Sequence, residues 1–303
     1  MSIQPSADIL PLLDTKRIEY KLDYNVSKQS SFKIGGNVDL AIFPRDTDQL
    51  IEAVRLLTRS DIKFEIIGNA SNILFAFDNY HGVFIFTELI SSLSVEGNRI
   101  TCQAGVSLTH LSNVAAQSSL SGLEFAFGIP ALVGGAVFMN AGAYGSQLSD
   151  VIEYTIAYDT QKDITYRIYD NGFGYRTSCY ERSRNLICLG ASFMLQAGNA
   201  CEINEKMAQN MASRRENQPL EFPSAGSYFK RPVGHFAGKL IEDCGLKGLR
   251  VGGAEVSKKH AGFIINVDNA SYTDVLSLEE KIKERVYQAF GIALEREVKV
   301  ITD

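Results

Sequence analysis

The sequence predicts an α+β protein with two parts. Short β-like runs alternate with amphipathic helices, and no unit is repeated along the 303 residues. A helical pattern over 203–217 ends at Gln218-Pro219, because proline stops a helix. This is the clearest break in the chain, and a chain of this length is long enough for two domains.

Strands and helices are expected in turn over the first 200 residues, after a lead-in at 1–24 that is irregular or helical. The expected strands are short apolar or alternating runs at 40–43, 63–67, 83–86, 99–104, 152–159, 163–169 and 186–195. Helices are expected at 46–58 and 108–118, where apolar residues recur at helical spacing.

Residues 201–303 are expected to form a second domain that starts with the helix over 203–217. Further helices are expected at 237–244 and 273–290, and strands at 252–255, 261–266 and 294–301. The helix over 273–290 ends at a capping glycine, Gly291. Its apolar stripe consists of Val275, Leu278, Ile282, Val286 and Phe290.

Composition argues against several functional classes. A net charge of −5 with 21% charged residues does not provide the basic surface that nucleic-acid binding requires. No apolar run is long enough to span a membrane, and the first twenty residues lack the pattern of a secretory signal. Five scattered cysteines without a CxxC pair, and four histidines without HExxH spacing, favour reduced thiols in the cytoplasm and no metal site.

Glycines gather in the segment 128–145, GIPALVGGAVFMNAGAYG, which contains five glycines and no charged residue. Glycine lets the backbone come close to a ligand. It also allows tight packing of a core element. From this segment alone both interpretations stay open.

Three familiar motifs are incomplete in this chain. Residues 172–177 begin like the dinucleotide motif GxGxxG but lack its third glycine, and 234–239 is one residue too short for a phosphate loop. Ser227 and Lys230 satisfy the SxxK pattern of penicillin-recognising hydrolases, but its companions SDN and KTG are missing.

Four other segments carry possible chemistry, each with a simpler alternative. The turn at 68–72 offers backbone N–H groups to phosphate oxygens, or is an ordinary turn. Arg176, among aromatic residues, suits a substrate carboxylate, or is a surface arginine. Ser227 lies in a loop of small residues that leaves its hydroxyl accessible or makes a turn. Glu297 lies on the polar face of the last strand, where exposure to solvent is the default.

Taken in order, these segments resemble the UDP-N-acetylenolpyruvoylglucosamine reductases, flavoenzymes of bacterial cell-wall synthesis. The resemblance spans about residues 25–303. Its segments are SSFKIGGNVDL (30–40), GNASNIL (68–74), the glycine run (128–145), FGYRTS (173–178), SAGSYFKRP (224–232), AGKLIEDCGLKGLRVGGAEVSKKHAGFIIN (237–266) and LEREVKVI (294–301).

The resemblance implies an FAD-binding domain at 25–200, similar to that of vanillyl-alcohol oxidase and divided into two lobes near 90–100. It implies a C-terminal α+β domain at 201–303 that binds a UDP-sugar. It also implies that NADPH reduces non-covalently bound FAD, and that the flavin passes hydride to UDP-N-acetylglucosamine enolpyruvate, which becomes UDP-N-acetylmuramate. No metal, nucleic acid, membrane or obligate protein partner is implied.

The resemblance also assigns residues. Arg176 binds the substrate carboxylate, Ser227 donates the proton, and Glu297 assists. Contacts to FAD come from Ile67, Gly68, Asn69, Ala70, Ser71, Asn72, Gly128, Ile129, Pro130, Gly134, Gly135, Asn140, Ala141 and Gly142. Contacts to the anionic substrate come from Tyr144, Arg215, Arg231 and Lys239.

The chain departs from the family pattern at three places. Ala70 stands where glycine is common, so alanine has to tolerate that backbone angle or the loop is shifted. Ala131-Leu132 replaces a small Gly-Ser pair near the flavin. The segment between Arg176 and the strand at 186 is too short for a tyrosine-bearing lid, as in the branch of the family that lacks it.

Alternative functions are a flavin oxidase or dehydrogenase for a small alcohol or hydroxy acid, a serine hydrolase using Ser227, and a nucleotide-binding module without catalysis.

Overall fold

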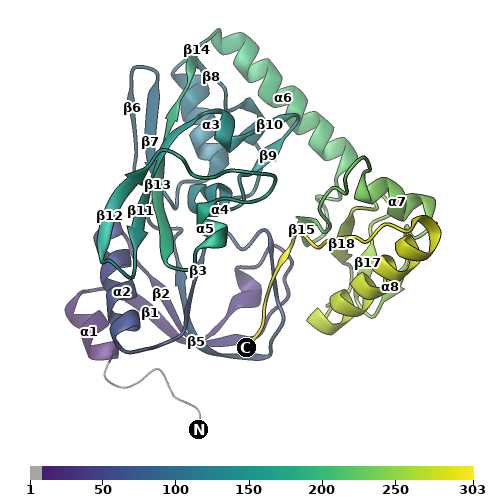
Figure 1. The fold of residues 1–303 in the computed structure, drawn as a ribbon, viewed down its shortest axis with the longest axis horizontal. Coiled ribbons are helices and arrows are strands. Elements are labelled where there is room, and N and C mark those ends of the chain that lie inside the picture. The colour runs from purple at the N-terminus through teal and green to yellow at the C-terminus, as the bar shows by residue number, and fades with distance from the viewer. Residues whose placement is uncertain (1–8) are drawn as a thin grey trace. The chain divides into compact units, whose positions relative to one another are not determined.

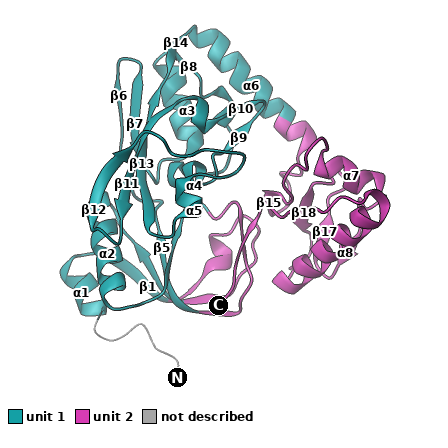
Figure 2. Ribbon diagram, in the orientation of Figure 1, with its two compact units in different colours: residues 1–22, 39–69, 81–213 teal, residues 23–38, 70–80, 214–303 magenta. Residues whose placement is uncertain are grey.

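The structure is a computed structural model that describes residues 9–303, so residues 1–8 of the expected lead-in lie outside the described residues. Helices and strands alternate along the chain (Figure 1). Contacts divide the chain into two compact units, coloured separately in Figure 2. The first unit consists of residues up to 22, 39–69 and 81–213. The second unit consists of 23–38, 70–80 and 214–303.

Most residues of a four-stranded sheet in the order β1-β2-β5-β3 belong to the first unit. Its strands are β1 (Glu19–Asn25), β2 (Asn37–Phe43), β5 (Asn79–Phe86) and β3 (Phe64–Ile67). Two helices accompany it, α1 (Leu10–Thr15) and α2 (Thr47–Arg59). Asp46 caps α2 by accepting a hydrogen bond from the backbone N–H of Gln49 at 2.8 Å. The lead-in therefore holds a helix and, from Glu19, a strand that the sequence did not predict.

A second sheet of five antiparallel strands forms the other lobe of this unit, in the order β12-β11-β13-β7-β6. The strands are β12 (Ile164–Ile168), β11 (Ile152–Asp159), β13 (Leu186–Met194), β7 (Arg99–Gln103) and β6 (Leu93–Glu96). Helices α3 (Leu108–Gln117) and α4 (Val133–Phe138) share a buried core with this sheet. The two sheets confirm the predicted two-lobed arrangement.

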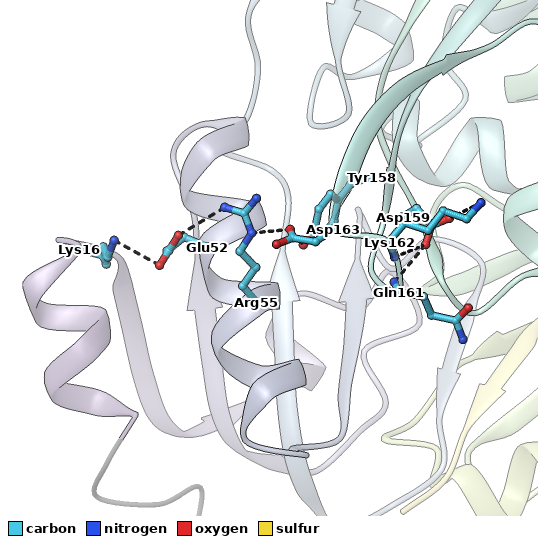
Figure 3. Close-up of polar contacts among 8 residues, drawn as sticks. All are labelled: Lys16, Glu52, Arg55, Tyr158, Asp159, Gln161, Lys162 and Asp163. Carbon is cyan, nitrogen blue, oxygen red and sulfur yellow. Dashed lines mark hydrogen bonds and ion pairs between the residues drawn. The ribbon is translucent and has the colours of Figure 1, made fainter.

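A row of charged side chains joins the two lobes of the first unit (Figure 3). Lys16 pairs with Glu52 of α2 at 3.2 Å, and Glu52 pairs with Arg55 at 3.8 Å. Arg55 Nε then donates to Asp163 in the turn between β11 and β12 at 2.6 Å. The hydroxyl of Tyr158, on β11, donates to the same carboxylate at 2.7 Å. The row therefore connects α2 of one lobe to the β11–β12 hairpin of the other.

The second unit contains a four-stranded sheet in the order β15-β18-β17-β16 and a parallel pair, β19 with β4. The strands are β15 (Ser224–Ser227), β18 (Phe263–Asn266), β17 (Ala254–Val256), β16 (Arg250–Val251), β19 (Lys299–Ile301) and β4 (Ile73–Phe75). Helices α7 (Ala237–Asp243) and α8 (Tyr272–Phe290) contribute to its core, as do Phe32, Ile34 and Leu74 from earlier in the chain.

Two expectations for the second unit were wrong in part. Phe290 is 42% exposed, and the buried stripe of α8 instead contains Glu279 together with Val275, Leu278, Ile282 and Val286. The final strand is confined to Lys299–Ile301. The segment 294–301 is not one strand, because it changes partners along its length. Residues 295–297 form backbone hydrogen bonds with residues 228–230, whereas β19 pairs with β4. Gly291 caps α8 at φ 69°, as predicted.

The remaining elements are short, apart from α6 (Ala200–Asn217), which begins three residues before the predicted helix. The others are β8 (Leu120–Ser121), β9 (Gly142–Ala143), β10 (Ser146–Gln147), β14 (Gln196–Ala197), α5 (Cys179–Arg182) and three 3₁₀ turns at Val26–Lys28, Glu124–Ala126 and Leu148–Asp150. Within residues 9–303, no helix combines the length and apolar character needed to cross a membrane. The domain limits 24/25 and 200/201 stay predictions.

Candidate active site

The turn at 68–72 follows β3 directly and is attached to the glycine run. Ile67 at the end of β3 is buried, and Asn69 Nδ2 donates to the carbonyl of Pro130 at 2.7 Å. The two segments that were predicted to hold FAD therefore meet in the first unit through this hydrogen bond. The chain passes from the first unit to the second between Asn69 and Ala70.

Ala70 adopts the left-handed backbone conformation that its position was expected to require. Its φ is 46°, and its side chain is 3% exposed. This conformation costs an L-residue about 1–2 kcal/mol, because Cβ crowds the following carbonyl. The turn is thus formed without glycine, and Ala70 carries the strain.

The glycines of the run divide into two kinds. A Cβ on Gly142 would lie 2.5 Å from the carbonyl oxygen of Ser146, and one on Gly134 would lie 3.0 Å from Cβ of Ala104. A Cβ on Gly135 would meet no heavy atom of residues 9–303 within 4 Å, and one on Gly68 only Leu132, at 3.8 Å. Packing therefore excludes a side chain at Gly142 and leaves little room for one at Gly134, whereas Gly135 and Gly68 border open space.

Short α4 begins inside the glycine run, and the Ala131-Leu132 pair fixes its start. The carbonyl of Ala131 accepts from the N–H of Leu108 at 2.9 Å, and Leu132 forms an isolated β-bridge with Ser107. Leu132 is also the residue nearest to a Cβ placed on Gly68. These two residues serve backbone pairing and packing beside the turn. Gly128 at φ 81° precedes Ile129 and Pro130, whose segment receives the bond from Asn69.

Asn140 fixes the loop that carries Arg176. Its side chain is fully buried and donates to the carbonyl of Gly174 at 3.0 Å, while its oxygen accepts from the N–H of Ser149 at 3.0 Å. Asn140 was predicted to contact FAD, and in the structure its amide bonds to protein groups. The bond to Gly174 holds the turn 174–177, in which Arg176 has a φ of 57°.

The guanidinium of Arg176 is held against the glycine run. One Nη donates to the carbonyl of Gly142 at 3.1 Å, and its Cζ lies 5.2 Å from the centre of the Tyr175 ring. Arg176 is half-buried, and the neighbouring Tyr175 is exposed. A planar guanidinium fixed on one side in this way is suited to bind a carboxylate in two-point fashion.

Tyr144 connects the end of the glycine run to α6. Its hydroxyl donates to the carbonyl of Asn210 at 2.8 Å, and Asn210 Nδ2 donates to the carbonyl of Glu124 at 3.0 Å. The ring of Tyr144 is still 44% exposed, so it can contact a ligand from this fixed position.

Ser227 lies at the end of β15, beside an irregularity in the pairing of β15 with β18. Ser224 pairs with Ile265 and Ser227 with Phe263, so the register shifts between them. Gly226 takes φ 78°, and a Cβ there would meet no heavy atom of the described chain within 4 Å. A bulge with left-handed glycine redirects the next side chain. Ser227 is exposed, as predicted, but the expected loop at 224–227 was wrong, because these residues pair with β18 as strand β15.

Glu297 lies between two other segments of the predicted site. Its N–H donates to the carbonyl of Tyr228 at 2.9 Å, and its carbonyl accepts from Asn72 Nδ2 at 3.4 Å. Glu297 is half-buried. Asn72 of the turn, Tyr228 directly after β15 and Glu297 of the final segment therefore meet in the second unit, although more than two hundred residues separate Asn72 from Glu297.

Ser31, near the N-terminus, also joins the turn at 68–72 to the strand that carries Ser227. Ser31 Oγ lies 2.7 Å from the carbonyl oxygen of Ser224 and 3.4 Å from that of Ala70. The N–H of Ser224 donates back to the carbonyl of Ser31 at 3.1 Å. The sequence indicated no role for Ser31 beyond the resemblance. Its contacts show that it joins the turn, at Ala70, to the start of β15, at Ser224.

The predicted substrate cations lie on exposed parts of the second unit. Arg215 is exposed near the end of α6, and its carbonyl accepts from Lys259 Nζ at 2.6 Å. Arg231 stacks on Phe236, with 4.5 Å from Cζ to the ring centre. Lys239 Nζ pairs with Asp243 on α7 at 2.6 Å. Lys230, the lysine of the SxxK pattern, pairs with Glu295.

Residues 9–303 contain no cluster of three or more His, Cys, Asp or Glu side chains that could hold a metal ion.

His260 supports the strand that pairs with Ser227. Its Nδ1 accepts from the N–H of Gly262 at 3.0 Å, and the carbonyl of Gly262 accepts from the N–H of Tyr228 at 2.8 Å. Burial lowers the pKa of His260 below its usual 6.5, with a smaller contribution from Lys247. Nδ1 can accept the hydrogen bond from Gly262 only when it carries no proton, so the lowered pKa favours the neutral ring that this bond requires. Spacing in the sequence gave no signal for this role.

We expect the protein to lose stability as the pH falls below about 6.5, because unfolded His260 binds a proton more readily than folded His260. The contribution of one such group is less than about 1.4 kcal/mol per pH unit. The free energy of unfolding, measured with denaturant at pH 7.5 and 5.5, should therefore fall less between these pH values in His260→Gln than in the wild type. His110→Gln, on an exposed site of α3, should behave as the wild type; equal pH dependence in all three would contradict the role of His260.

Comparison with known proteins connects these features. Residues 38–160 match the FAD binding domain family, and residues 218–301 match the family described as UDP-N-acetylenolpyruvoylglucosamine reductase, C-terminal domain. The reductase of that name from Caldanaerobacter subterraneus is 44% identical over 283 residues, which is 92% of this chain and 93% of the relative. The chain belongs to the UDP-N-acetylenolpyruvoylglucosamine reductase family.

Solved structures agree with this family. The reductase from Thermus caldophilus superposes with a TM-score of 0.80 at 31% identity, covering 94% of this chain and 99% of the other. Berberine bridge enzyme, at 13% identity and a TM-score of 0.51, shares the fold over 65% of this chain and 44% of the other. The predicted family, its fold and its class as an oxidoreductase of peptidoglycan synthesis are thereby confirmed.

The matched ranges cover most of the predicted site. The FAD binding domain includes the turn 68–72 and the glycine run, and the C-terminal domain includes Ser227 and Glu297. Arg176 lies between the two ranges, in a segment that neither family covers. FAD is the cofactor of this chain, and the role of each residue remains a prediction.

Proposed function

We propose that the chain reduces UDP-N-acetylglucosamine enolpyruvate to UDP-N-acetylmuramate with NADPH as the source of hydride, in the cytoplasm. The observation that carries the proposal is the meeting of three segments in the second unit. Glu297 bonds through its backbone to Tyr228, beside Ser227, and to Asn72 of the turn. A proton donor, a carboxylate and the predicted phosphate turn are thus neighbours.

The residues of the first unit fit FAD. Gly68 and Gly135 border open space where any side chain would project, and such glycines allow a ligand to reach the backbone. The turn also offers consecutive backbone N–H groups, which bind phosphate oxygens well. We therefore assign the diphosphate of FAD to the turn and the glycine run. When bound, FAD supplies the hydride that it has received from NADPH.

Arg176 binds the carboxylate of the enolpyruvyl group in this proposal. Its guanidinium is already held by the carbonyl of Gly142, so little conformational freedom is lost when the substrate arrives. Negative charge builds up next to the carboxylate when hydride adds to the enol carbon. A fixed cation at that place stabilises the transition state more than the ground state.

Ser227 then donates its hydroxyl proton to the carbon beside the carboxylate. A serine hydroxyl is a weak acid, so it requires a short approach to the carbanion and a polar partner. The bulge at Gly226 supports such an approach, because it directs Ser227 outward from β15. Glu297 is the partner that we assign to this step. Tyr144, Arg215, Arg231 and Lys239 are assigned to the UDP-sugar.

Visible spectroscopy tests the proposed cofactors. The purified protein, or the protein after incubation with FAD, should show flavin absorbance that NADPH bleaches under anaerobic conditions. A protein that shows no flavin absorbance after incubation with FAD, or whose flavin is not reduced by NADPH, contradicts the proposal.

A pair of alanine substitutions separates ligand contact from packing in the glycine run. Gly135→Ala should weaken FAD binding and leave the apoprotein as stable as the wild type or up to about 1 kcal/mol more stable, because alanine favours a helix. Gly142→Ala should destabilise the apoprotein, because its Cβ would overlap Ser146. Titration with FAD and apoprotein melting measure both effects. Wild-type FAD affinity in Gly135→Ala would remove Gly135 from the cofactor site.

A further inference from the structure

A buried carboxylate lies beneath the proposed proton-transfer residues. Glu279, on the inner face of α8, is 1% exposed. The hydroxyl of Tyr228 donates to its Oε2 at 2.7 Å, and Nη1 of Arg296 donates to the same oxygen at 3.0 Å. Lys283 Nζ lies 2.5 Å from its other oxygen. One buried carboxylate therefore accepts a hydroxyl and a guanidinium on one oxygen and forms an ion pair with Lys283 through the other, while the side chains of Arg296 and Lys283 stay 34% and 32% exposed.

The two side chains that share Oε2 are the sequence neighbours of the proposed catalytic pair. Tyr228 follows Ser227, and Arg296 precedes Glu297. Successive side chains of an extended segment point to opposite sides. When Tyr228 and Arg296 are held inward, Ser227 and Glu297 are directed outward, which agrees with an exposed Ser227 and a half-buried Glu297.

Backbone pairing adds a second link between the same segments. Phe229 and Arg296 form an isolated antiparallel bridge, and the N–H of Glu297 donates to the carbonyl of Tyr228 at 2.9 Å. The side-chain bonds to Glu279 and this bridge hold the segments 227–229 and 295–297 in one register. Burial, and then the charge of Glu279, raise the pKa of Tyr228, so its hydroxyl stays a donor.

We propose that Glu279 is a positioning residue, which sets the distance and direction of Ser227 and Glu297 by binding Tyr228 and Arg296 on one oxygen. The inference rests on the proposed function of Ser227 and Glu297. Apolar residues would fill the same space on α8 without joining the two segments. A charged residue on the apolar face of the predicted helix was the signal for this role in the sequence.

The test compares Glu279→Gln with Glu280→Gln. Glu280 is the exposed neighbour on α8, and it pairs with the same Lys283 at 3.1 Å, so the control removes an equal charge from the same helix. Under anaerobic conditions, stopped-flow spectroscopy follows flavin reduction by NADPH, then flavin reoxidation by UDP-N-acetylglucosamine enolpyruvate. Hydrogen exchange follows the amides of Tyr228 and Glu297.

In Glu279→Gln, NADPH should reduce the flavin at the wild-type rate, and the enolpyruvyl substrate should reoxidise it about 10- to 100-fold more slowly. Small misplacements of catalytic groups have effects of that size. The amides of Tyr228 and Glu297 should exchange faster. Tyr228→Phe, which removes a single hydroxyl, should change the same step in the same direction and decides the question if Glu279→Gln does not fold.

Equal reoxidation rates and equal amide protection in Glu279→Gln and Glu280→Gln would overturn the positioning role. Normal reoxidation in Ser227→Ala would instead overturn the proposed role of Ser227 as proton donor, and flavin that stays reduced when the wild type meets this substrate would overturn the proposed function. The two failures are therefore distinguishable in the same experiment.

Discussion

Ser227→Ala should leave flavin reduction by NADPH unchanged and slow flavin reoxidation by the enolpyruvyl substrate by about 10²- to 10⁴-fold, the usual contribution of a positioned general acid. The substitution removes one exposed hydroxyl at the end of β15. It keeps the backbone bonds of the strand, so substrate affinity should change little. Rapid mixing of the reduced enzyme with substrate measures this step directly.

A serine elsewhere in the second unit serves as the control for Ser227→Ala. Ser277 is exposed on α8, and Ser277→Ala should behave as the wild type in both steps. If Ser227→Ala also reoxidises at the wild-type rate, the proton comes from another group. A large loss of flavin reduction in Ser227→Ala would indicate a disturbed cofactor site instead.

Arg176→Lys should weaken substrate binding and slow flavin reoxidation by about 10²- to 10³-fold, the usual cost of losing a group that stabilises a developing anion. Lysine keeps the charge but loses the planar, two-point geometry. It also loses the bond that fixes the guanidinium on the carbonyl of Gly142. Both residues share the same backbone strain at φ 57°, so stability should change little.

Arg184→Lys is the matched control for this substitution, because Arg184 is an exposed arginine a few residues along the chain. It should leave both half-reactions unchanged. Saturation of reoxidation with substrate separates affinity from rate. A variant Arg176→Lys that only raises the substrate concentration needed, with the limiting rate unchanged, would restrict Arg176 to binding.

Periodic segments of the fold could be predicted from the sequence. The helix α2 and the strand β11 appear where apolar spacing predicted them, and Gly291 ends α8. Local patterns failed where pairing over long distances decides the structure. The segment 294–301 alternates like one strand, yet it is divided between two partners, residues 228–230 and β4.

The candidate site was predicted as residue types in an order, and its geometry was not. Nothing near Ser31 in the sequence indicates that its hydroxyl lies within 2.7 Å of the carbonyl oxygen of Ser224. The glycine run could not be divided into packing and open positions until the neighbours of Gly142 and Gly135 were known. Glu279 was not predicted either, although its spacing from Val275 and Ile282 places it on the apolar face of α8.

The most direct test of the proposed reaction is a single turnover of the wild-type enzyme. Enzyme reduced with one equivalent of NADPH, without oxygen, is mixed with UDP-N-acetylglucosamine enolpyruvate. We predict full recovery of flavin absorbance and one equivalent of UDP-N-acetylmuramate per flavin. Flavin that stays reduced in the presence of this substrate, or that recovers without forming the saturated product, would contradict the account.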